Sequence, residues 1–296
     1  MWNRLKNKIA ALLAAALLSG LFSCAACADA EMRRVVLGAD LNEEQIAKVY
    51  LSFGFPRGEV PELRLSNAEE RAALSGYVAD AVIGTKAISC VYLELLPQGS
   101  GMDVKSENIS WCTPDMYTNA LTTGGIADAR VKVAAPFSVS GTAALAGIYK
   151  AYEDMTGKKL DELAKDVSTQ ELTITGELAN QIGSEDSTSI VNELKQILGE
   201  TVNMSDDEVR GVIRKIAEGY QVRLTDTQVE QLLDLVRALE KLDTGALTKR
   251  VEGLQNTLEK VGDAKDQVVG FLQSMKRAFE TLKELLDRIS GFFDGR

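Results

Sequence analysis

The stretch PFSVSGTAA, residues 136–144, carries the side chains best suited to chemistry in this chain. It follows an apolar segment typical of a strand and precedes a segment typical of a helix. Its hydroxyls and backbone amides are therefore expected at a helix N-terminus, which can bind an anion or another small ligand. The candidate ligand-binding residues are Ser138, Ser140, Gly141 and Thr142. The same residues could equally form a helix cap packed close to a sheet, and the sequence leaves both interpretations open.

Two familiar motifs are absent from this turn. It lacks the GxxxxGK spacing of a P-loop and the GxSxG spacing of a nucleophile elbow. The chain has no histidine, which excludes Ser-His-Asp catalysis, Cys-His catalysis and histidine-ligated metals within one chain. An enzyme would have to use the turn's hydroxyls together with Lys132 or Lys150. No catalytic residue is assigned, and no metal site or cofactor is predicted.

The helix predicted in PDMYTNALTTGG, residues 114–125, could line a cleft together with this turn. Pro114 occupies its first position, where the missing amide hydrogen costs nothing. Tyr117 and Asn119 are its candidate ligand-binding residues. The alternative is a half-exposed helix that only connects two strands. Trp111, just before it, is expected in the core rather than as a platform for a ligand.

Adjacent acidic residues occur at 43–44, at 69–70 and in DDE at 206–208. Paired carboxylates can carry acid–base catalysis. Each group here falls in the first turn of a predicted helix, where capping and the helix dipole favour acids without any chemistry. We therefore interpret all three groups as structural.

The predicted strands lie in the first half of the chain. Residues 87–96 and 102–110 flank the turn-like PQGSG and should pair as a hairpin. A helix separates 102–110 from the apolar segment 129–135, so those two strands should be parallel. The pattern predicts an α+β fold, in which a small mixed β-sheet domain with packed helices precedes an all-α region.

One helix-start pattern recurs along the chain. It places N-caps at Asn42, Ser205 and Thr225, each with a Glu or Gln three residues later that can bond back to the cap amide. SNAE at 66–69 and STQE at 168–171 repeat the pattern. Beyond residue 160 the predicted helices cover 168–182, 187–199, 205–219 and 225–243.

The first 30 residues have the features of a signal peptide. Basic residues precede an apolar run that is shorter than the roughly 20 residues of a spanning helix, and ADA at 28–30 suits cleavage. Lipid modification of Cys24 in LFSC is the alternative. We therefore predict a secreted or cell-envelope protein without a transmembrane anchor after cleavage. The expected units are the signal peptide (1–30), a mixed-sheet domain (31–160), a helical region (161–244) and a long amphipathic, coiled-coil-like helix (245–296).

The C-terminal helix is the predicted interaction surface. From Leu247 to Phe293, nearly all positions in alternating steps of four and three are apolar, which is a heptad pattern. Such a helix can associate with a second copy or with a protein partner, or it can fold back on the other helices. Nucleic acid is excluded as a partner, because a chain with a net charge of −10 repels phosphates.

Two cysteines, Cys90 and Cys112, remain after the signal peptide. In the predicted hairpin their Cα atoms lie farther apart than the roughly 7 Å that a disulfide can span. We therefore expect both to be unbonded.

Four segments of the chain carry a family resemblance. They are GADL (38–41), MYTNAL (116–121), VAAPF-VSGTAAL (133–145) and KAYE (150–153). Through them the chain resembles the YpuA-like family, exported proteins of Gram-positive bacteria that are grouped as a domain of unknown function. The similarity extends to about residue 260. It implies export, and it implies no known reaction, cofactor or catalytic residue.

Two functions follow from these observations. The first is a non-enzymatic binding or interaction protein of the cell envelope or the extracellular space. The alternative is a domain that binds a small ligand or an anion at 136–144, or a histidine-independent enzyme that uses this turn. If the hydroxyls of the turn and a lysine converge in a concave pocket, the alternative gains support. If the hydroxyls only cap the helix, it loses support.

Overall fold

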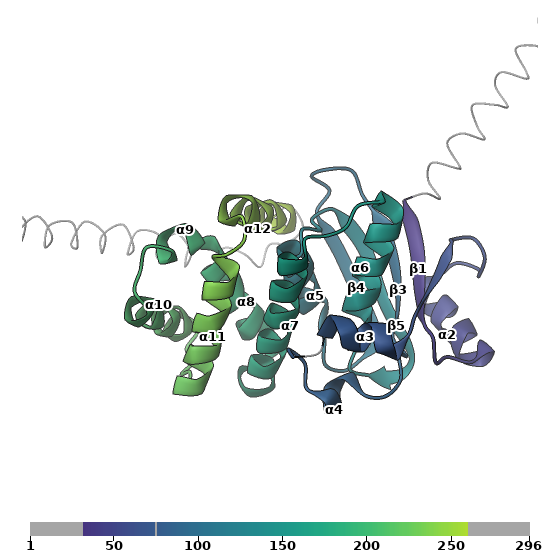
Figure 1. Cartoon of the computed structure of the whole chain (residues 1–296), viewed down its shortest axis with the longest axis horizontal. Coiled ribbons are helices and arrows are strands. Elements are labelled where there is room, and N and C mark those ends of the chain that lie inside the picture. Colours follow the sequence, from purple (N-terminus) through teal and green to yellow (C-terminus); the bar gives the residue numbers. More distant parts are fainter. Residues whose placement is uncertain (1–31, 75, 260–296) are drawn as a thin grey trace, which may run out of the picture.

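The computed structural model describes residues 32–74 and 76–259, which form five strands and eleven helices. The strands make one mixed sheet with helices on both of its faces (Figure 1). The predicted α+β class is therefore confirmed. The last strand ends at Val139, and within the described residues only helices follow it, in agreement with the predicted order.

The sheet has the strand order β2-β1-β3-β5-β4. Its strands are β1 (Arg33–Gly38), β2 (Glu62–Leu65), β3 (Cys90–Leu95), β4 (Met102–Ile109) and β5 (Ala129–Val139). β3 is antiparallel to its neighbours β1 and β5, whereas β1 is parallel to β2 and β5 is parallel to β4. Four of the five strands therefore point the same way and end at the same edge of the sheet.

The predicted hairpin between 87–96 and 102–110 is wrong, because β5 lies between β3 and β4. The predicted parallel pairing of 102–110 with 129–135 is confirmed. Burial explains why β5, and not β4, lies next to β3 in the sheet. β5 is largely buried and suits the interior of the sheet, while β4 carries Asp103 and Lys105 and is only partly covered. Charged residues of this kind are tolerated on an edge strand, where they also discourage pairing with other chains.

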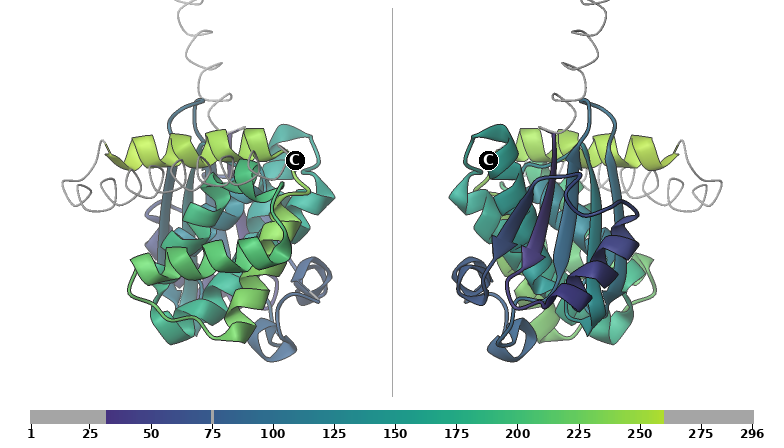
Figure 2. Two further views of the ribbon diagram at one scale, coloured as in Figure 1. Left: turned by 90° about the vertical axis from the view of Figure 1, so that its left-hand side faces the viewer. Right: turned by 90° about the vertical axis from the view of Figure 1, so that its right-hand side faces the viewer.

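The helices form layers around the sheet. They are α2 (Glu43–Phe53), α3 (Asn67–Leu74), α4 (Asp80–Ile83), α5 (Pro114–Thr123), α6 (Thr142–Thr156), α7 (Glu162–Ile182), α8 (Ser184–Gln196), α9 (Leu198–Thr201), α10 (Asp206–Gly219), α11 (Asp226–Leu239) and α12 (Thr244–Glu259). α2 lies across one face of the sheet, and α3, α5 and α6 lie on the other (Figures 1 and 2). Helices α7 to α12 stack beyond α5, away from the sheet.

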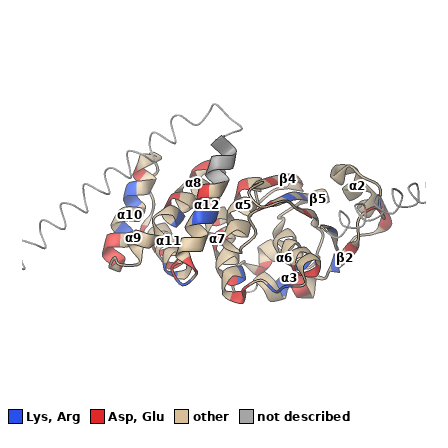
Figure 3. Ribbon diagram, turned by 90° about the horizontal axis from the view of Figure 1, so that it is seen from above, with Lys and Arg blue, Asp and Glu red and all other residues tan. Residues whose placement is uncertain are grey.

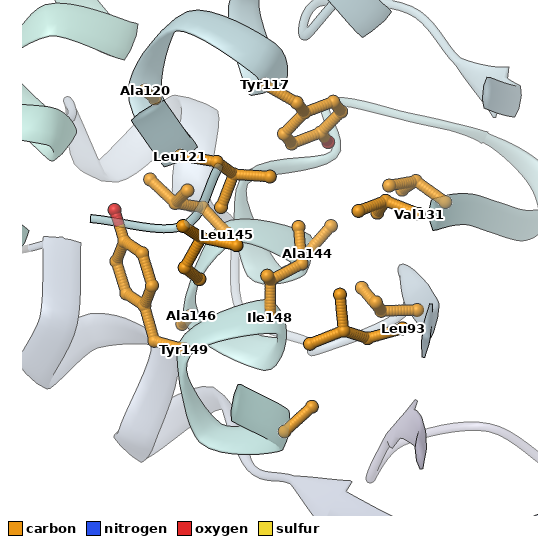
Figure 4. Packing of buried hydrophobic residues seen from close by; sticks show 14 of the residues in the cluster. Leu93, Tyr117, Ala120, Leu121, Val131, Ala144, Leu145, Ala146, Ile148 and Tyr149 are labelled. Carbon is orange, nitrogen blue, oxygen red and sulfur yellow. The ribbon is translucent and has the colours of Figure 1, made fainter. Parts of the chain in front are cut away.

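The largest core lies between the sheet and helices α5 and α6. Val131 of β5 packs there with Leu121 of α5 and Ile148 of α6, all fully buried (Figure 4). Phe53 anchors α2 in a separate core on the opposite face of the sheet. Helices α7 to α12 share another core. Seen from above, acidic and basic residues are intermingled over the outside of these layers (Figure 3).

α7 joins the two parts of the molecule, because its side chains contribute to both the sheet core and the helical core. A fully buried ion pair lies at this junction, with Lys195 Nζ 2.8 Å from Glu171 Oε1. Lys195 also donates to the Asn119 carbonyl, and Thr123 Oγ1 donates to Glu171 Oε2. Burial lowers the pKa of Lys195, and the Glu171 carboxylate opposes that shift. The domain boundary at 160–161 stays a prediction.

The recurring helix-start pattern is largely confirmed. Capping boxes form at Asn42, Ser205 and Thr225. Ser66 and Glu69 exchange the same pair of hydrogen bonds. The start predicted at STQE is wrong, because α7 begins earlier, with Asp161 as its N-cap. Ser168 lies inside the helix and donates to the Lys165 carbonyl, a bond that serine can make without starting a helix.

α12 packs back onto the body of the molecule. Leu247 and Val251, the first two positions of the heptad pattern, are buried in the helical core. Arg250 Nε donates to the Thr122 carbonyl of α5 at 2.9 Å. The heptad positions after 253 lie outside the side chains that the structure describes, so the long helix and its association stay predictions. Within the described ranges, no helix has the length and apolar character needed to cross a membrane.

Cys90 and Cys112 are free thiols, as predicted, and both are buried. Cys90 packs with α2 on one face of the sheet, and Cys112 packs in the core on the other face. The sheet therefore separates them, which is a different reason from the hairpin geometry that led us to expect free thiols.

Candidate functional site

An open cleft of about 560 Å³ lies beyond the carboxyl ends of the parallel strands. Ligands of open α/β sheets usually bind at this edge, because loops and helix N-termini meet there. Residues that follow β1, β4 and β5 line the cleft, and α3 contributes one side chain. α4 and the loop after it form one wall, at the lower end of the sheet in Figure 1.

A buried carboxyl group lies at the floor of the cleft, beside the start of α6. Glu70 is 1% exposed, and its Oε1 lies 2.9 Å from Thr142 Oγ1. Thr142 Oγ1 lies 3.3 Å from Ser140 Oγ, so the three side chains form a chain of hydrogen bonds that leads into the open cleft. Asn67 Nδ2 donates to the other oxygen of Glu70. Burial raises the pKa of Glu70, and the bonds from Thr142 and Asn67 oppose that shift.

Gly141 allows the chain to turn sharply between β5 and α6. Its φ is +95°, a left-handed conformation that favours glycine. A Cβ atom at this position would lie 2.5 Å from Ile109 Cγ2 and 2.5 Å from Tyr117 Oη. The Tyr117 hydroxyl donates to the Gly141 carbonyl at 2.7 Å from beneath the turn. Backbone conformation and close packing therefore both require glycine here.

Ser89 contributes to the cleft a hydroxyl that has no protein partner among the described residues. It immediately precedes β3, is 6% exposed, and has no side-chain hydrogen-bond partner among the described residues. No fully buried side-chain polar atom in that part of the chain lacks a partner, so the Ser89 oxygen must be open to the cleft. Asp40 lines the same cleft, and only its Oδ2 is engaged, by the Ala87 amide at 2.8 Å. Both groups can therefore bond to a ligand.

Two aromatic side chains line the cleft near Ser140. Phe137 is 48% exposed. Trp111 is half-buried, and its six-membered ring packs so closely on α7 that a Cβ on Gly176 would lie 2.5 Å from Cζ2. The prediction that Trp111 is a core residue is therefore only partly right, because the ring both packs on α7 and lines the cleft. Lys86 adds an exposed positive charge to the lining.

The structure brings most of the turn's predicted site residues together. Ser140, Gly141 and Thr142 line the cleft, and no side chain caps α6. Ser138 is exposed and is not part of the lining. The hydroxyls of Ser140 and Thr142 therefore belong to a concave site and do not cap α6, and the lysine in the lining is Lys86.

The other two candidates, on α5, lie elsewhere. Tyr117 supports the turn from below and is fully buried. Asn119 faces α8, where its side-chain amide donates to the Thr188 carbonyl at 3.2 Å. α5 is thus a buried helix between the sheet and α7, not the half-exposed connector considered from the sequence. Of its polar side chains, Asn119 and Thr123 bond to the helical part of the molecule.

The lysines considered for an enzyme also lie outside the cleft lining. Lys132 Nζ donates to the Phe53 carbonyl, on the face of the sheet that α2 covers. Lys150 Nζ donates to the Arg64 carbonyl and to Glu69. Among the described residues, no cluster of three or more Cys, Asp or Glu side chains is placed to hold a metal ion.

Glu70 is the site residue that we missed in the sequence. Both Glu69 and Glu70 lie in the first turn of α3, as predicted, but only Glu69 bonds to the cap residue Ser66. Glu70 instead shares the buried face of α3 with Leu74, four residues later. The sequence could have indicated Glu70 as a site residue, because it places an acid on the apolar face of a predicted helix. A buried carboxyl group costs free energy unless something compensates for it.

Glu70 and Glu69 provide a matched pair for a pH test. In the folded protein Glu70 keeps its proton to higher pH than in the unfolded chain, so folding loses stability as pH rises through that interval. Glu70→Gln cannot ionise and can still bond to Thr142 and Asn67. We expect the variant to be more stable than the parent at about pH 8, and the gain to disappear below about pH 4.

Glu69→Gln should behave in the opposite way. Hydrogen bonds from Lys150 and Ser66 lower the pKa of Glu69 to about 2. That carboxylate contributes stability above the ordinary glutamate pKa and loses it in acid, so its removal should cost stability at neutral pH. Urea unfolding across pH measures both variants, and the same sign for both would contradict the assignment.

Comparisons with known proteins place the chain in a family. Residues 37–261 match the family described as "Protein of unknown function (DUF1002)". The chain belongs to this family. It is also 33% identical over 287 residues to "Uncharacterized protein YpuA" of Bacillus subtilis (strain 168), which covers 95% of this chain and 93% of that protein. No solved structure matches the chain.

The cleft lies entirely within the part of the chain that matches DUF1002, because its lining runs from Asp40 to Ala143. The description of DUF1002 names no reaction or ligand, so the geometry of the cleft carries the functional argument. The resemblance to YpuA-like proteins is confirmed, and it extends over nearly the whole chain.

Proposed function

We propose that this chain is an exported, non-enzymatic protein of the cell envelope or extracellular space that binds a small, uncharged polar ligand in the cleft. The observation that carries the proposal is the Ser89 hydroxyl, which is nearly buried, open to the cleft and without a partner among the described residues. Polar groups in such positions normally have a hydrogen-bond partner, and a ligand would supply one.

The charges in the cleft support an uncharged ligand rather than an anion. The amides at the start of α6 form the position that an anion would prefer. Glu70 accepts from the hydroxyl of Thr142, the first residue of α6, and the Asp40 carboxylate lies in the same cleft. An anionic ligand would have to enter next to both carboxyl groups, with only Lys86 to offset them among the lining residues.

Two neighbouring serines allow the proposal to be tested. Ser140→Ala removes a hydroxyl in the cleft, and Ser138→Ala removes an exposed hydroxyl on β5, two residues earlier and outside the cleft. A thermal-shift screen of the full chain against sugars, peptides and phosphorylated metabolites would identify a ligand. At a hundred times its Kd a ligand adds about 2.7 kcal/mol of stability, which is easily detected.

We expect Ser140→Ala to weaken binding by roughly tenfold, the usual effect of losing one hydrogen bond of about 1 kcal/mol or slightly more. Ser138→Ala should leave binding unchanged. Equal loss in both variants, or no loss in either, would show that the ligand binds elsewhere. A screen in which no compound raises the melting temperature would count against ligand binding altogether.

Export is the part of the proposal that rests on the sequence. The basic residues, apolar run and ADA at 28–30 support removal of the first 30 residues. Mass spectrometry of the protein from its native host should find a chain that starts near Glu31. An intact Met1 would contradict cleavage, and a lipid on Cys24 would show that cleavage occurs earlier.

A further inference from the structure

The cleft that we propose as the binding site presents donors and acceptors side by side. The Asp40 carboxylate only accepts hydrogen bonds and the Lys86 ammonium only donates, while the hydroxyls of Ser89 and Ser140 can do either. Asp40 and Lys86 bring opposite charges to the lining, and Glu70 is buried beneath it. A ligand that satisfies this surface must offer donors and acceptors at short spacing without a net charge.

The chain of hydrogen bonds at the floor of the cleft determines whether Ser140 acts as a donor or as an acceptor toward a ligand. Thr142 Oγ1 donates its one hydrogen to Glu70 Oε1, so in the pair with Thr142 the Ser140 hydroxyl is the donor, and the lone pairs of Ser140 Oγ are left to accept from a ligand hydroxyl. The charged groups around Glu70 shift its pKa in opposite directions. Arg71 favours its ionised form, whereas burial and the Asp40 carboxylate favour its neutral form.

The aromatic residues add an apolar surface to this polar floor. Phe137 leaves nearly half of its surface exposed, although a side chain of this kind is normally buried. It lines the cleft together with Trp111, whose ring is held from behind by α7 at Gly176. An aromatic wall next to hydroxyls suits a ligand with one apolar face and polar edges, the arrangement of many small-molecule sites.

We propose, building on the ligand-binding function above, that the ligand is a saccharide. The C–H face of a pyranose ring would pack on Phe137 and Trp111, and its hydroxyls would bond to Asp40, Ser89 and Ser140. Each sugar hydroxyl is one donor and two acceptors, which matches the mixed lining. A cleft of about 560 Å³ has room for a short oligosaccharide.

Trp111 provides a direct signal for this test. The chain has two tryptophans, Trp2 and Trp111, so Trp2→Phe in the full chain leaves the cleft residue as the only one. We would titrate this protein with trimers of N-acetylglucosamine, glucose in β1–4 linkage and glucose in α1–4 linkage. Trialanine and inorganic phosphate are the comparison ligands. At least one saccharide should shift the Trp111 emission in a saturable way, and the comparison ligands should not.

Phe137→Ala and Leu51→Ala form the matched pair of variants. Both remove an exposed apolar side chain, but Leu51 is 81% exposed on α2 and does not line the cleft. Phe137→Ala should weaken saccharide binding at least about tenfold, because it removes the apolar surface on which the ring would pack. Leu51→Ala should leave binding unchanged within about twofold, a difference below 0.5 kcal/mol.

The outcomes separate the ligand class from the binding function itself. If trialanine or phosphate saturates the signal and the saccharides do not, the saccharide proposal is wrong while binding in the cleft stands. Saccharide binding that Phe137→Ala leaves intact would place the sugar elsewhere and overturn the inference. If no ligand of any class changes either the Trp111 emission or the melting temperature, both proposals fail.

Discussion

Lys195→Met is expected to lower the free energy of unfolding by about 3–5 kcal/mol, the usual cost of removing one partner of a buried ion pair. Lys195 and Glu171 are both 0% exposed, and their side chains lie 2.8 Å apart. Methionine fills much of the lysine volume, so the loss would come mainly from the carboxylate left without its cation. Urea denaturation followed by circular dichroism measures the change.

Two further variants test whether the unpaired charge causes this loss of stability. Arg214→Met breaks an exposed ion pair with Asp226 and should cost less than about 1 kcal/mol. Glu171→Gln, added to Lys195→Met, replaces the isolated charge by a neutral amide and should recover most of the loss. If the double variant is as unstable as Lys195→Met alone, the unpaired charge is not what destabilises the protein.

Gly141→Ala is expected to cost about 3 kcal/mol, and Gly125→Ala only about 1 kcal/mol. Both glycines have nearly the same backbone conformation, with φ of +95° and +96°, so both variants pay the roughly 1–2 kcal/mol of left-handed strain. The two positions differ in the space that is available for a Cβ atom. A Cβ at Gly125 meets nothing within 4 Å, whereas at Gly141 it would lie 2.5 Å from Tyr117 Oη and Ile109 Cγ2. Overpacking of this kind typically costs 1–3 kcal/mol.

The difference between the two glycine variants therefore measures how tightly the turn is packed. Chemical denaturation gives both values under the same conditions. Since Gly141 lies between Ser140 and Thr142, the same substitution should also weaken ligand binding, which Gly125→Ala should not affect. Equal stability of the two variants would mean that the turn can relax around a methyl group, contrary to the packing described here.

Local signals in the sequence predicted the local structure well. Asn42, Ser205 and Thr225 all start helices, because a capping box needs only residues within one turn of each other. The strand order could not be obtained in this way. The turn-like PQGSG suggested a hairpin, whereas the pairing depends on how β5 competes with β4 for the interior of the sheet, and that competition involves the whole sheet.

The candidate site could likewise be predicted only where its residues are neighbours in the sequence. The turn at 136–144 was recognisable because its hydroxyls and glycine lie next to each other in the chain. Glu70 and Ser89 join it only through the fold, from α3 and from the start of β3. Asn119 lies on the predicted helix, but the direction of its side chain depends on where α8 packs. Residues brought together from distant segments cannot be grouped by spacing alone.

α5 bonds to two regions of the molecule, the turn beside the cleft and the helices α8 and α12. Near its beginning, Tyr117 donates to the backbone of the turn beside the cleft. Near its end, carbonyl groups accept hydrogen bonds from Lys195 of α8 and Arg250 of α12. A shift of α5 along its axis would disturb both sets of bonds at once, so movement of the turn is mechanically coupled to helices that do not line the cleft. We therefore expect a ligand that holds the turn in place to restrain α8 and α12 as well, through the hydrogen bonds of α5.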